Sequence, residues 1–209
     1  MKPSAVEYGT FWVADAAHEL PVCSARVETT FQEIDLGAVA ALQAAMSLLT
    51  PDAIRHRLET GRRCFSLLQA GQIICYGWVS RGMESVGELE RDFQFQDDEV
   101  YIWDCGTIPP LRGNRCYSAL LNQIILQCHR EGIQRVWIGA SSLNQPSIRG
   151  IINAGFQHVV DMIYRRFGPV KWLRFYKAPE VTPIHLTAAY RILLDGEWRV
   201  GSAAMGLKR

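Results

Sequence analysis

Residues 108–121 constrain the fold more than any other part of the chain, because they read as a strand end, a tight loop and a helix start. The β-rich run 100–103 precedes them, and apolar residues recur at helical spacing after the loop. Backbone N–H groups at such a helix start bind anions. Gly113 gives the loop backbone freedom, while Arg112 and Arg115 add positive charge that no neighbouring acid cancels. The loop predicts a pyrophosphate site and no metal.

A second segment, residues 144–156, has the pattern of a helix that begins at an Asn cap and ends in Gly-Phe. One long amphipathic helix over roughly 114–131 and a β-rich run at 135–138 lie between the two segments. The predicted order is therefore strand, helix, strand, helix.

Over about residues 29–167 these segments resemble the GNAT superfamily of N-acetyltransferases. The acyl-CoA loop of that family reads Arg or Gln, two residues, Gly, one residue, then Gly or Ala, and Arg112 stands at its first position. Arg115 stands where the family has its first Gly, and Tyr117 where it has Gly or Ala. Ile151 occupies the position of the usual general-acid tyrosine, so Tyr117, a water or departure of the free thiolate would replace it.

The resemblance implies a GNAT fold and direct transfer of an acetyl or other acyl group from acyl-CoA to an amine in a ternary complex. The end of the preceding strand would run beside the pantetheine arm, and the loop with the helix start would hold the pyrophosphate. Asn144 could instead only cap its helix. The residues expected to bind the co-substrate are Gly106, Thr107, Ile108, Arg112, Gly113, Asn114, Arg115, Cys116, Tyr117, Ser118 and Asn144.

Three residues of the strand before the loop are candidates for the chemistry. The frequent glutamate position of the family aligns with Tyr101, which is no base at neutral pH unless its pKa is strongly perturbed. Asp104 and Glu99 are the candidate general bases. A carboxylate in such an apolar strand must be paired or have a raised pKa, and pairing with an arginine is the alternative role for Asp104. Strand alternation places Asp104 on the same face as Ile102.

Length and composition predict a single domain, since 209 residues with 48% hydrophobic and 21% charged residues suit one globular enzyme. The predicted class is α/β (α+β), with a mostly antiparallel sheet of six to seven strands and about four helices. Residues 29–177 form the predicted core, 1–28 supply an added edge strand, and 178–209 form an extension of turns with a frayed end. The acid-rich segment 81–98 is expected to be a solvated connection.

The formal net charge of +1 and the lack of a long basic run argue against nucleic acid as a partner. No window approaches the roughly 18 apolar residues of a membrane span. The six cysteines lack the spacing of metal ligands, which favours a reducing cytoplasm and no metal. The expected acceptor is a small-molecule amine such as an amino sugar or other metabolite, and the terminal strands could pair two chains into a homodimer.

Two other functions stay open at this point. A GNAT-fold module could hold a CoA-like ligand, or none, without turnover and act as a regulator. Alternatively, the acyl group could come from an acyl carrier protein, whose acidic surface would require a basic, salt-sensitive binding face.

Overall fold

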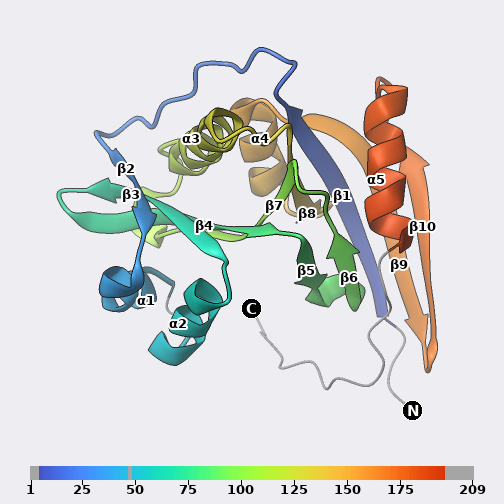
Figure 1. Ribbon diagram of the computed structural model, residues 1–209, viewed down its shortest axis with the longest axis horizontal. Helices are drawn as coiled ribbons and strands as arrows, with labels where there is room; N and C mark the ends of the chain where they lie inside the picture. Colours follow the sequence, from blue (N-terminus) through green and yellow to red (C-terminus); the bar gives the residue numbers. More distant parts are fainter. Residues whose placement is uncertain (1–4, 47–48, 196–209) are drawn as a thin grey trace.

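One mixed sheet of eight strands runs through the protein in the computed structural model, which describes residues 5–46 and 49–195 (Figure 1). The elements in chain order are β1 (Ala5–Asp15), β2 (Thr30–Ile34), α1 (Val39–Met46), α2 (Pro51–Glu59), β3 (Arg63–Gln69), β4 (Gln72–Arg81), β5 (Met83–Val86), β6 (Arg91–Gln94), β7 (Glu99–Thr107), α3 (Cys116–Arg130), β8 (Arg135–Ser141), α4 (Gln145–Ala154), β9 (Gln157–Phe167), β10 (Val170–Lys177) and α5 (Pro183–Asp195). The strand order across the sheet is β10-β9-β1-β8-β7-β4-β3-β2, and β5 and β6 form a separate hairpin.

Among the described strands, β7 and β8 are the one parallel pair, and all other neighbours in the sheet are antiparallel. The predicted class, a mostly antiparallel mixed sheet with flanking helices, is confirmed. The sheet is larger than expected, with eight strands instead of six or seven.

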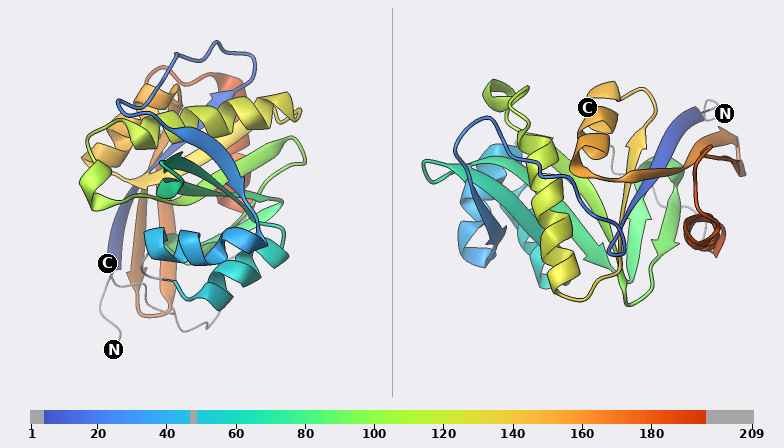
Figure 2. Two further views of the ribbon diagram at one scale, coloured as in Figure 1. Left: turned by 90° about the vertical axis from the view of Figure 1, so that its left-hand side faces the viewer. Right: turned by 90° about the horizontal axis from the view of Figure 1, so that it is seen from above.

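Helices cover both faces of the sheet (Figure 2). Helices α3 and α4 cover one face, where Leu120 and Ile124 pack against Ile102. On the opposite face, α1 and α2 enclose Trp78, while α5 and the β5–β6 hairpin enclose Trp137. No helix in the described ranges is long and apolar enough to cross a lipid bilayer.

The N-terminal strand β1 is not the edge strand that the sequence suggested. It lies inside the sheet, paired with β8 through Asp15↔Arg135 and Gly9↔Ser141, and with β9 on its other side. Its run Phe-Trp-Val-Ala is buried on both faces, which is the pattern of an interior strand. This continuous apolar run was already visible in the sequence, and it favours an interior position over an edge position.

The acid-rich segment 81–98 is not a solvated connection. It folds into the β5–β6 hairpin, whose Leu89, Phe93 and Phe95 are buried against Phe11 of β1 and the residues of α5. The three apolar side chains belong to one buried cluster, but the acidic residues between them obscure this pattern in the sequence.

The tail also departs from expectation, because residues 183–195 form helix α5 instead of turns. The Thr182 hydroxyl accepts a hydrogen bond from the N–H of His185 at 3.3 Å, and Pro183 opens the helix. Ala189, Ile192 and further apolar residues at helical spacing then bury one face. The end expected to be frayed, residues 196–209, lies outside the described residues.

Replacing Phe93 with alanine tests the anchoring of the hairpin. The side chain is 1% exposed, so Phe93→Ala should lower the free energy of unfolding by about 3–5 kcal/mol. Met83→Ala on the same hairpin is the control, because Met83 is 55% exposed and should cost less than about 0.5 kcal/mol. Urea unfolding measures both, and equal small effects would mean that the hairpin is loosely held.

Candidate active site

Strands β7 and β8 separate from each other within the sheet. They are in register from Glu99↔Arg135 to Ile102↔Ile138, after which β7 continues to Thr107 and β8 to Ser141 without further pairing. The parted ends leave backbone N–H and C=O groups on the inner edge of β7 that can pair with an extended ligand.

A β-bulge in β7 lies beside this opening. Tyr76 of β4 is opposite Gly106 and Trp78 is opposite Trp103, so two residues of β7 face the single residue between them on β4. Asp104 adopts the left-handed conformation there, with φ of 41°. The bulge turns the Asp104 side chain toward α2, so the face that strict alternation gave for this residue is wrong.

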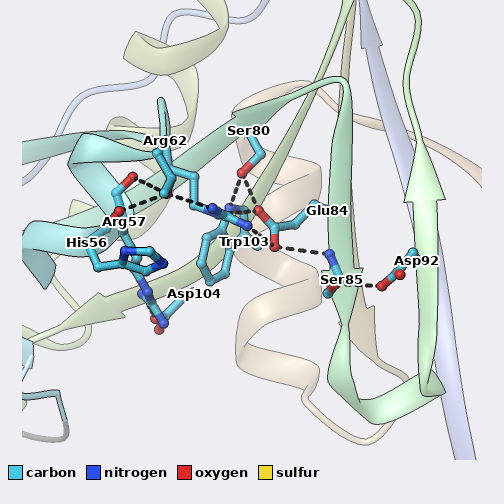
Figure 3. A network of polar contacts seen from close by, with 10 residues as sticks. His56, Arg57, Arg62, Ser80, Glu84, Ser85, Asp92, Trp103 and Asp104 are labelled. Carbon is cyan, nitrogen blue, oxygen red and sulfur yellow. Dashed lines mark hydrogen bonds and ion pairs between the residues drawn. The ribbon is translucent and has the colours of Figure 1, made fainter. Parts of the chain in front are cut away.

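Asp104 forms an ion pair in the network of Figure 3. The Asp104 Oδ2 atom lies 2.5 Å from Nη1 of Arg57, and the carboxylate keeps 32% of its side-chain surface exposed. The guanidinium carbon of Arg57 lies 4.4 Å from the ring centroid of Trp103 and 5.1 Å from that of Trp78. The site therefore combines a carboxylate with two aromatic faces and already holds one cation.

A second carboxylate, Glu84, holds Trp103 in place. The indole N–H of Trp103 donates to the Ser80 hydroxyl at 2.8 Å, and Ser80 donates to Glu84 at 2.5 Å (Figure 3). Arg62 donates to the same carboxylate from Nε at 2.8 Å. Glu84 was hidden in the segment expected to be solvated, and no local sequence signal pairs it with Arg62.

Tyr101 lies at the point where the two strands separate. Its hydroxyl is 3.1 Å from the position that a Cβ atom on Gly139 of β8 would occupy, and its ring stacks on Phe95. Burial raises the pKa of Tyr101 well above its ordinary value. The phenol therefore stays protonated at neutral pH, where it can donate a hydrogen bond but cannot act as a base.

Glu99 lies at the other end of β7, where it is fully buried. It accepts hydrogen bonds from the N–H of Gln96 at 3.0 Å, from Arg135 at 2.9 Å and from Arg191 of α5. Burial raises the pKa of Glu99, but the Gln96 N–H and the two guanidiniums outweigh it and hold the pKa below its usual value. These partners tie β7, β8 and α5 together, an arrangement that favours a structural role.

The loop after β7 begins with a 3-10 turn at Pro109–Leu111 and leads directly into α3. Gly113 and Arg115 have φ of 81° and 58°, so Arg115 takes the backbone conformation that favours glycine. No side chain caps α3, and its first-turn N–H groups have no helical partners. Arg112 and Arg115 are both exposed beside them.

Other predicted residues shape this loop from within. The Asn114 side chain donates to the Leu111 carbonyl at 3.3 Å, which closes the turn. Cys116 and Ser118 are buried, so their side chains are not exposed at the loop surface. The Asn114 carbonyl also accepts from the N–H of Arg26 at 2.8 Å, which brings a third arginine of the chain to the loop. Sequence spacing gave no hint of this contact.

The backbone groups at the end of β7 form hydrogen bonds with two different partners. The N–H of Ile108 donates to Ile74 of β4 at 3.0 Å, whereas the carbonyl of Thr107 accepts from Nε of Arg112 at 3.3 Å. Gly106 lies under Tyr76, whose hydroxyl would be 2.6 Å from a Cβ atom at that position. A larger residue at this position would force the Tyr76 ring to move.

Helix α4 stands beside the start of α3. Asn144 caps α4 by accepting from the N–H of Ser147 at 3.2 Å, and the Ser147 hydroxyl donates to Tyr117 at 3.3 Å. The Tyr117 ring lies against Gly150, where a Cβ atom would be only 2.4 Å away. Burial raises the pKa of Tyr117 well above its ordinary value. Ile151 is completely buried, and its apolar side chain has no proton to donate.

Solved structures share this architecture at low sequence identity. A GNAT-family acetyltransferase from Colwellia psychrerythraea superposes with a TM-score of 0.58 at 12% identity, over 78% of this chain and 56% of that one. A GCN5-related N-acetyltransferase from Sphaerobacter thermophilus gives 0.55 at 15% identity, over 77% of this chain. This chain spans only 51% of that second protein, about half its length. No protein-family model matches the sequence, and no curated protein matches it.

Neutralising Glu99 tests its structural role. Because its pKa is lowered in the folded state, its stabilising contribution is complete above the pKa of an unfolded glutamate and is lost as the pH falls through the folded value. Glu99→Gln should lower the free energy of unfolding by about 3 kcal/mol at pH 7 and reduce the further loss between pH 5 and pH 3. Urea unfolding across that range gives both values. Exposed Glu19→Gln is the control, and matching pH curves for the two variants would contradict the role.

Proposed function

The chain has the fold of the GNAT acetyltransferases, and from that premise we propose that it transfers an acyl group from an acyl-CoA to an amine. The observation that carries the proposal is the opening between β7 and β8, which leads directly to an uncapped helix start flanked by exposed arginines. An extended pantetheine arm needs backbone partners, and a pyrophosphate needs N–H donors and positive charge. The two requirements meet at adjacent positions along one strand and loop.

The co-substrate would lie along the inner edge of β7, with its pyrophosphate on the first turn of α3. Arg112 and Arg115 would supply charge, and Gly113 would allow the phosphates to approach the backbone. Because Cys116 and Ser118 are buried, they would contribute N–H groups and not side chains. Asn144 would act through the cap of α4, since its side-chain oxygen is already an acceptor there.

In the proposed reaction the amine nitrogen attacks the thioester carbonyl carbon, and the C–S bond breaks to release the CoA thiolate. An acceptor that arrives as an ammonium first loses one proton to Asp104, directly or through a water, which frees the lone pair that attacks. The second proton leaves the nitrogen as the amide forms and passes to the CoA thiolate. The protonated Tyr101 at the strand divergence would donate a hydrogen bond to the carbonyl oxygen or to the leaving sulfur. Glu99, enclosed by two arginines, is the weaker candidate base.

The acceptor proposed is a small-molecule amine that is cationic before it reacts. Support comes from Arg57, whose guanidinium lies over Trp103 and against Asp104. The same aromatic face and carboxylate suit an ammonium group. Arg57 would have to release Asp104 when the amine binds, which makes acceptor binding and base activation a single event.

Acetyl-CoA binding tests the loop. At a hundred times Kd, acetyl-CoA should stabilise the native state by about 2.7 kcal/mol and raise Tm by about 5–10 °C. In Arg112→Ala the shift at the same concentration should fall sharply, because one charge beside the pyrophosphate is gone. Thermal unfolding with acetyl-CoA, longer acyl-CoAs and free CoA measures the effect.

Arg55→Ala is the matched control, since Arg55 is an exposed arginine on α2, away from the loop. It should keep the full shift. Equal shifts in wild type and Arg112→Ala would place the ligand elsewhere, and no shift with any CoA would favour a carrier-protein donor or a non-catalytic module.

Asp104→Asn tests the proposed base. With the amine that releases CoA from acetyl-CoA fastest, kcat should fall by about 10²- to 10⁴-fold while the acetyl-CoA thermal shift stays unchanged. Asp97→Asn, an exposed acid before β7, should retain the wild-type rate. An unchanged kcat and pH profile in Asp104→Asn would exclude this carboxylate. Binding without transfer to any amine in wild type would favour the regulatory module.

A further inference from the structure

A separate group of histidines lies at the opposite end of β1 from the opening. His18, His158 and His185, three of the five histidines of the chain, line a hollow of about 430 Å³. The nearby Asp15 is paired with Arg135 at the start of β8, whereas the opening lies beyond Ile138. The proposed acyl transfer makes no use of these residues.

Asp15 and His18 are held on one tight turn. The N–H of His18 donates to the Asp15 carbonyl at 3.0 Å, and the N–H of Ala17 donates to Asp15 Oδ1 at 2.8 Å. Fixed in this way, the carboxylate directs its other oxygen to His185 in the first turn of α5, with 2.9 Å between Oδ2 and Nε2. The turn and the helix thus bring three polar side chains to one point.

One ligand atom from each of Asp15, His18 and His185 can be chosen so that all three lie within 4.8 Å of one another. Bonds of about 2.0–2.2 Å to a tetrahedral metal place ligand atoms about 3.3 Å apart. His185 and Asp15 are near that separation, and the exposed His18 has its ring centroid 5.8 Å from that of His185. Ala17 supplies the outer hydrogen bond that orients a ligating carboxylate.

Two imidazoles with one carboxylate are typical ligands of Zn²⁺, whereas Ca²⁺ and Mg²⁺ prefer sets made of oxygen. A hydrogen bond that only anchors α5 would need His185 and Asp15 alone. The second imidazole, on the same turn as the carboxylate, gives the group three ligands and leaves a fourth position for water. We propose that Asp15, His18 and His185 bind one Zn²⁺ ion, which joins the first turn of α5 to the end of β1.

Zinc binding by the untagged, metal-free full-length protein tests the proposal. Calorimetry against a competing chelator should give one Zn²⁺ per chain, and at a hundred times Kd the ion should raise Tm by about 5–10 °C. His18→Ala should lose both signals without unfolding, because His18 is exposed, and His18→Cys should restore binding with a thiolate ligand. His56→Ala, which removes an exposed histidine of α2, is the matched control.

Cobalt gives a readout that a purely structural contact would not produce. Co²⁺ in place of Zn²⁺ should develop the intense visible absorption of a tetrahedral site in wild type and His56→Ala, and not in His18→Ala. Absence of stoichiometric Zn²⁺ binding by wild type would overturn the proposal. Equal affinities in wild type and His18→Ala would overturn it as well.

Discussion

Strand β7 must satisfy two requirements that ordinary pairing cannot meet together. It stays paired with β4 along nearly its whole length, yet it leaves β8 after four residues. The bulge at Asp104 supplies the local twist for this departure and reverses the faces of the residues that follow. As a result, a polar side chain reaches the α2 face beside Trp103, and the freed edge of the strand leads to the arginine-rich loop.

Strand β7 carries two carboxylates, Glu99 and Asp104, whose different surroundings suit them to different roles. Glu99 is enclosed by two guanidiniums and a backbone N–H, and its ion pairs join β7 to β8 and α5. Asp104 has one guanidinium partner and remains open to solvent. Loss of one partner from an enclosed ion pair leaves a buried charge and destabilises the fold, whereas an exposed pair can exchange its partner for a ligand.

The parts of the fold that sequence predicted are those with short-range causes. The loop around Gly113 and the Asn144 cap follow from patterns within a few residues. The face of Asp104 could not be predicted, because a bulge depends on pairing with β4. Nor could the meeting of Asp15 with His185, which are 170 residues apart and joined only by the folded sheet. Roles in catalysis and co-substrate binding stay predictions.

The position of β1 gives the folding process a long-range order. Thr10 and its partner Ala140 are 130 residues apart, and the other neighbour of β1, β9, comes later still. During synthesis β1 is made before β8 and β9. Its apolar residues therefore stay exposed until those two strands have left the ribosome and can pair with it. Pairing across so long a stretch of chain favours slow folding, and it leaves the apolar face of β1 uncovered until its two neighbours are in place.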